Sequence, residues 1–176
     1  MSEYRNSVQY AGLADVQSTI AALRGTNPAD RQHARERLIA IGRPAVAPLV
    51  RLLDDPHHQV RWEVVKTLAA IGDPAAAPAL TEALEDEAAD VRWVAAHALI
   101  DLGHEAVRPL LSALAYRASS PELLEGAHHV LSRLYWLDSP KLVKPVLAAL
   151  DGPAPQMAVH LADYSALNTI RASQRD

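Results

Sequence analysis

A block of residues recurs in this chain at a spacing of 31, and this repetition limits the possible folds more than any single motif does. The segment Val60-Arg61-Trp62 returns as Val91-Arg92-Trp93, and an aspartate precedes each arginine by six residues. A fixed period of this length is typical of a solenoid, in which each copy stacks on its neighbours. The repetition weakens toward both ends of the chain, since Leu123 stands at the next arginine position.

Each copy is predicted to contain two helices. Glycine just past an apolar run ends one helix, as at Gly72, and proline in a first turn starts another, as at Pro74, because its missing N–H would have no partner there. The predicted helices are Leu13 to Leu23, Pro28 to Ile41, Pro44 to Leu53, His57 to Ile71, Pro74 to Leu84, Ala88 to Leu102, Glu105 to Tyr116, Pro121 to Leu137, Pro140 to Leu150 and Ala154 to Ile170.

The composition fits one domain whose core is built from Ala, Leu, Val and Ile, since 49% of the 176 residues are hydrophobic and Phe is absent. We expect an N-terminal cap over residues 1–27, repeats over 28–150, and a C-terminal cap helix with a frayed tail over 151–176. No apolar run approaches the ~20 residues of a membrane span, and the polar start lacks a signal peptide, so we expect a cytoplasmic protein. The net charge of -4 makes nucleic acid an unlikely partner, and the absence of Cys excludes thiolate chemistry.

The pattern Asp-x5-Arg, followed by an Ala-rich helix and Ile-Gly-Asp-Pro, resembles the HEAT repeats, and most closely the short phycobilisome-lyase-type HEAT-like repeats. The resemblance covers about residues 28–150. It implies an all-α, right-handed α-α superhelix of about five helix pairs, with the second helix of each pair lining a concave surface. In that family aspartates and arginines of successive copies form a buried polar ladder. The matching residues here are Asp55, Arg61, Asp86 and Arg92.

The helical wheel places two tryptophans where packing does not need them. At 100° per residue Val60, Val64 and Leu68 share one side of their helix, and Trp62 lies opposite. Trp93 repeats this position in the next copy. Exposed tryptophan beside charged groups is typical of a binding hot spot, although each ring could also lie flat over Ala-rich packing. The predicted partner-binding residues on the concave face are Trp62, Glu63, Lys66, Trp93, Val94, His97, Asp101 and His128.

No catalytic residue, metal site or cofactor is predicted. His97 and His128 occupy equivalent positions of adjacent copies and could face each other across the groove, but no metal-binding spacing accompanies them. A nucleophile dyad, a Gly-rich phosphate loop and paired buried carboxylates are all missing from the pattern. We therefore expect a non-catalytic scaffold, monomeric or weakly dimeric, that binds an unknown protein partner through its groove.

Two alternatives from other classes remain open. The bilin lyases and their chaperone-like relatives, after which the repeat is named, imply that an aromatic groove with His and Asp receives a tetrapyrrole by stacking and hydrogen bonding. HEAT-like DNA glycosylases use concave tryptophans with a catalytic aspartate, which Trp93 and Asp101 resemble, but this groove carries little basic charge. The His-Glu pairs of deoxyhypusine hydroxylase are represented only by His104-Glu105, which does not support that chemistry.

Overall fold

The computed structural model describes residues 15–117, 119–135, 140–156, 158–159, 162, 166 and 168. Every regular element in this part of the chain is helical. After a helix over residues 15–23, the elements are α2 (Pro28–Ile41), α3 (Arg43–Val50), α4 (His58–Ile71), η1 (Pro74–Ala76), α5 (Ala77–Glu82), η2 (Ala83–Glu85), α6 (Ala89–Leu102), η3 (Gly103–Ala106), α7 (Val107–Arg117), α8 (Pro121–Leu134) and α9 (Pro140–Leu150).

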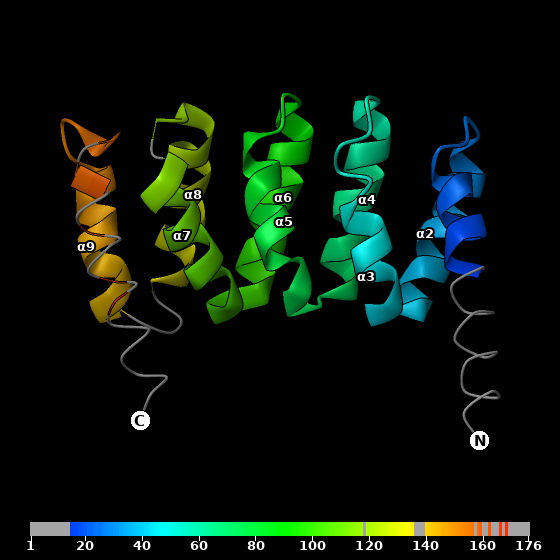
Figure 1. The fold of residues 1–176 in the computed structure, drawn as a ribbon, viewed down its shortest axis with the longest axis horizontal. Coiled ribbons are helices and arrows are strands. Elements are labelled where there is room, and N and C mark those ends of the chain that lie inside the picture. Colours follow the sequence, from blue (N-terminus) through cyan, green and yellow to red (C-terminus); the bar gives the residue numbers. More distant parts are fainter. Residues whose placement is uncertain are drawn as a thin grey trace, which may run out of the picture.

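The helices stack as two rows. In one row α4 packs between α2 and α6, and α6 in turn packs against α8. In the other row α5 packs against α7, and α3 contacts η1. Figure 1 shows the pairs side by side, with α2 near one end of the stack and α9 at the other. The predicted all-α solenoid is therefore confirmed.

Glycines end the long helices at the predicted places. Gly42, Gly72 and Gly103 have φ angles of 70°, 65° and 62°, which L-residues with a Cβ rarely adopt. Gly72 donates its N–H to the carbonyl of Leu68 and so satisfies one of the last acceptors of α4. At each of these glycines the chain leaves a long helix and continues into an element of the opposite row.

The predicted helix from Pro74 to Leu84 is the element that differs most. The structure divides it into η1, α5 and η2, so that only Ala77–Glu82 is α-helical. The missing N–H of Pro78 does not explain this division, because Pro48 stands at the same distance after Pro44 and lies inside α3, which is not divided. The predicted ends at Leu13, Leu137 and Ile170 lie outside the described residues.

A continuous apolar core joins the two rows. Leu38, Val64, Leu68 and Leu99 are essentially buried in one row, and Leu80 is equally buried in the other. None of the helices in the described part of the chain combines the length and apolar character that crossing a bilayer needs.

Candidate functional site

The two repeated tryptophans have different surroundings. Trp93 on α6 is 63% exposed, whereas Trp62 on α4 is half-buried and packs against the core. The Lys66 Nζ atom lies 3.9 Å from the centroid of the Trp62 ring, which gives this tryptophan a cation–π partner within its own helix. Trp93 is therefore the ring that is open to a ligand.

Two histidines extend the surface that begins at Trp93. The ring centroids of Trp93 and His97 are 3.9 Å apart, and those of His97 and His129 are 5.7 Å apart. His97 Nδ1 lies 2.9 Å from the carbonyl oxygen of Trp93; because this oxygen can only accept, Nδ1 carries the hydrogen and donates it. We call Trp93, His97 and His129 the ring series. It crosses from α6 to α8.

A cavity of about 290 Å³ lies beside the ring series, between α6 and α8. We call it the α6–α8 cavity. Its lining combines rings, a guanidinium and carboxylates with apolar groups: Leu84, Ala89, Arg92, Trp93, Ala96, Glu122, Glu125, Gly126 and His129. A Cβ added at Gly126 would lie 3.0 Å from the Leu84 Cδ2 atom, so the absence of a side chain there lets α8 approach Leu84 closely.

Arg61 carries the central part of the polar ladder. Its Nε and Nη2 atoms donate to the two carboxylate oxygens of Asp86 at 2.7 and 2.9 Å, and Nη1 donates to the backbone carbonyl of Asp55 at 2.8 Å. Glu87 accepts a further bond at 2.9 Å. This arginine joins the turn before its own helix to the corresponding turn of the next copy. Asp86 and Glu87 raise the pKa of its guanidinium, against the opposing effect of burial.

Asp55 holds the preceding turn. Burial by itself would raise the pKa of its carboxyl, but hydrogen bonds from the His57 backbone N–H and ring, together with the Arg24 guanidinium, outweigh burial and hold that pKa below its usual value. The Arg24 Nε atom is 2.8 Å from the carboxylate. Asp55 is thus fixed as an anion.

The ladder changes at Arg92. This arginine donates to the backbone carbonyls of Asp86 and Glu87 at 2.8 and 3.1 Å, just as Arg61 does to Asp55. The residue 31 positions after Asp86 is Arg117, so the next copy offers no carboxylate there. Among the described residues Arg92 forms no ion pair, and it lines the α6–α8 cavity instead.

Two predicted binding residues lie elsewhere than expected. Glu63 is only 4% exposed, because α2 covers it: the Arg35 Nη1 and Arg31 Nε atoms lie 2.6 and 3.4 Å from its carboxylate. A helical wheel of α4 shows only α4 itself, so it could not predict that α2 covers Glu63. His128 does not face His97, since its Nε2 atom lies 2.9 Å from an Asp151 carboxylate oxygen.

His129, and not the predicted His128, is the α8 residue whose ring lies next to that of His97. The repeat spacing of 31 residues made His128 the counterpart of His97. In the structure, however, α8 is rotated about its own axis, so that it buries a different set of repeat positions from α6. The buried residues of α8 are Leu123, Leu124, Ala127, Val130, Leu131 and Leu134. A wheel drawn on these alone would have placed Glu125 and His129, four residues apart, on the open side. Of the other predicted residues, Val94 is half-buried and Asp101 is exposed near the end of α6.

Comparison with known proteins identifies the repeats. Residues 16–100 match the family described as HEAT repeats. This stretch of the chain consists of HEAT repeats. Two curated relatives are similar to it: the phycocyanobilin lyase subunit beta of Thermosynechococcus vestitus, 40% identical over 79 residues, and the phycobilisome maturation protein of Synechococcus elongatus, 36% identical over 74 residues. These matches span 45% and 42% of this chain but only 37% and 36% of the relatives.

A solved structure resembles this chain over most of its length. It is the complex of CpcE and CpcF of phycocyanin lyase from Nostoc sp. PCC7120. One of its chains is 26% identical, with a TM-score of 0.56, and the match covers 85% of this chain and 98% of that one.

These relatives contradict two predictions made from the sequence. The non-catalytic scaffold was the wrong choice, because the relatives are named for bilin lyase activity and phycobilisome maturation, which agrees with the alternative. The expectation that the chain is not an enzyme conflicts with the same names. The repeat pattern records how helices stack, and it carries little information about what the exposed face binds.

Proposed function

We propose that this protein is a component of a bilin lyase and that it binds phycocyanobilin or a closely related open-chain tetrapyrrole. The observation that carries this proposal is the similarity to a phycocyanin lyase chain over 98% of that chain's length. The similarity to a phycocyanobilin lyase subunit and to a phycobilisome maturation protein supports the same proposal.

The ring series supplies a stacking surface for such a molecule. A bilin is a long conjugated system whose pyrrole rings present flat faces, and flat faces pack well against exposed aromatic side chains. Trp93 offers the largest open ring, and His97 and His129 continue the surface toward α8. We propose that the tetrapyrrole lies along this series.

The charges of the α6–α8 cavity fit the polar groups of a bilin. Arg92 has no carboxylate partner among the described residues, so it can pair with a propionate of the pigment through a charge-assisted hydrogen bond. Glu122 and Glu125 line the same cavity and can accept hydrogen bonds from pyrrole N–H groups. Carboxylates and a guanidinium in one cavity suit a ligand that carries both acids and N–H donors.

The role of this chain in the reaction is to bind and orient the pigment. The chain contains no cysteine, so it has no thiol with which to hold a bilin covalently. A held and oriented reactant reacts faster because its translational and rotational freedom has already been lost. Since the related lyase is a complex of two chains, we propose that this protein acts together with a second HEAT-repeat subunit.

A pigment titration tests the proposal. The purified protein is added to phycocyanobilin, and the visible absorption spectrum is followed for the wild type, Trp93→Ala and the control Tyr116→Ala. Tyr116 is also an exposed aromatic residue, but it lies on α7. The proposal predicts a saturable spectral change with the wild type and the control, and its loss with Trp93→Ala. A spectrum that stays that of free pigment at every wild-type concentration would overturn it.

A further inference from the structure

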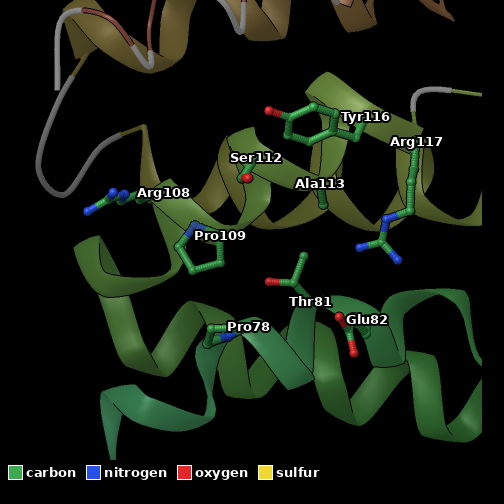
Figure 2. A pocket seen from close by; sticks show the side chains of 9 residues that line it. All are labelled: Pro78, Thr81, Glu82, Arg108, Pro109, Ser112, Ala113, Tyr116 and Arg117. Carbon is green, nitrogen blue, oxygen red and sulfur yellow. The ribbon is translucent and has the colours of Figure 1, made fainter. Parts of the chain in front are cut away.

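Tyr116 marks a second surface, on the row of helices that does not carry Trp93. Its side chain is 81% exposed, and among the described residues only Trp93 is another large hydrophobic side chain with such exposure. Tyr116 lines a cavity of about 550 Å³ between α5 and α7, which we call the α5–α7 groove. Figure 2 shows its ring above Ala113, with side chains of both helices on either side of the open space.

One side of the groove is formed by a single face of α7. Arg108, Ser112 and Tyr116 are spaced four residues apart and form one stripe along α7. At 1.5 Å per residue this stripe is about 12 Å long, which matches about four residues of a polyproline-type peptide at about 3.1 Å each. The small buried residues Thr81 and Ala113 form part of its lining.

The apolar part of the groove consists of two prolines, Ala113 and one aromatic ring. Pro78 is exposed on α5, Pro109 is half-buried on α7, and Tyr116 stands at the far end of the stripe. An exposed aromatic ring is a surface on which proline-rich segments pack, because these segments are already extended in solution and lose little entropy on binding. Ser112 lies between the rings and presents a hydroxyl group to a peptide backbone.

The charges of the groove favour an acidic residue at one end. Arg117 is paired with Glu85, whose carboxylate oxygen lies 2.6 Å from its Nη1 atom. Arg108 is exposed and forms no ion pair among the residues that the structure describes. In Figure 2 Arg108 stands at the end opposite Arg117 and Glu82. A negative charge on the partner is therefore complementary at the Arg108 end.

We propose that the α5–α7 groove binds an extended, proline-containing segment of a partner protein, with an acidic residue beside Arg108 and an apolar ring or side chain on Tyr116. This surface is separate from the ring series. The protein can therefore hold a ligand at α6 and α8 while a partner is held at α5 and α7.

Fluorescence anisotropy with the full-length protein tests this surface. The probe is a labelled peptide Glu-Pro-Leu-Pro-Pro-Leu, which is made in the forward and in the reversed sequence. A Lys variant of each peptide carries Lys in place of Glu. We expect saturable binding of the Glu peptide in one direction, weakened about tenfold by Tyr116→Ser, in line with the loss of an aromatic contact. Arg108→Glu should weaken binding of the Glu peptide about fivefold and strengthen binding of the Lys variant.

Arg51→Glu is the matched control, because Arg51 is an exposed arginine at the end of α3, away from the groove. It should leave the affinity unchanged, as should Trp93→Ala, so failure of pigment binding and failure of this proposal are distinguishable. The absence of saturation in either direction at about 1 mM peptide would overturn the proposal. Equal weakening by Arg51→Glu and Arg108→Glu would also overturn it, since the attraction would then be a property of net charge.

Discussion

Replacing Arg61 by alanine should cost this protein a large part of its stability. Arg61 is only 6% exposed, and the side chain of its partner Asp86 is 9% exposed. The substitution removes two bonds to the Asp86 carboxylate, one to the Asp55 carbonyl and one to Glu87. Asp86 would remain as a poorly hydrated anion between two repeats.

The magnitude follows from that unpaired charge. Removing one partner of a buried ion pair typically costs about 3–5 kcal/mol, which is a large fraction of the about 5–15 kcal/mol of a whole domain. For a domain of this size the loss corresponds to a fall in Tm of about 6–20 °C. Arg92→Ala is the matched comparison, because Arg92 occupies the same repeat position but donates only to backbone carbonyls. Its replacement should cost about 1 kcal/mol.

Urea unfolding followed by circular dichroism measures both variants. A second variant, Arg61→Met/Asp86→Asn, removes both charges but keeps the side-chain oxygen that accepts from the Ala88 N–H at 2.8 Å. It should recover part of the stability lost in Arg61→Met alone. The reasoning is refuted if Arg61→Ala and Arg92→Ala cost the same, or if the double variant is less stable than Arg61→Met.

Three further predictions concern other sites. Gly126→Val should lower the unfolding free energy by about 1–3 kcal/mol, measured by urea titration, because its side chain would push against Leu84. The stability advantage of the wild type over Asp55→Asn should be present above pH 3.8, the ordinary pKa of the carboxyl, and disappear as the pH falls through the lower folded-state pKa; urea titrations from pH 3 to about 7 measure it. Trp93→Ala should change the Tm by no more than about 2 °C, since the ring is largely exposed, and a larger fall would make Trp93 a packing residue.

The local parts of the fold were predictable from the sequence. Helix ends at Gly42, Gly72 and Gly103 follow from glycine's access to positive φ, which depends only on the residue itself. The division of the Pro74 to Leu84 helix was missed, and Pro78 gave no signal of it, since Pro48 stands at the same place in the undivided α3.

The exposure of a site residue was predictable where it depends on one helix alone. It was not predictable where it depends on how two helices pack together. The wheel of α6 alone indicates that Trp93 points outward, and the structure has it exposed. Glu63 also lies outward on the wheel of α4, but Arg31 and Arg35 come from α2 and bury it. The neighbour of His97 depends on the rotation of α8, which a fixed repeat offset does not contain.

Pigment attachment tests the central claim most directly. Cells that make phycocyanobilin, apo-phycocyanin and a second HEAT-repeat lyase subunit are compared with and without this chain, and the bilin fluorescence of the phycocyanin polypeptide is read on a denaturing gel. The account predicts a rise in fluorescence with the wild type and with Arg51→Ala, and a return to background with Trp93→Ala. Equal fluorescence with and without the chain would contradict it.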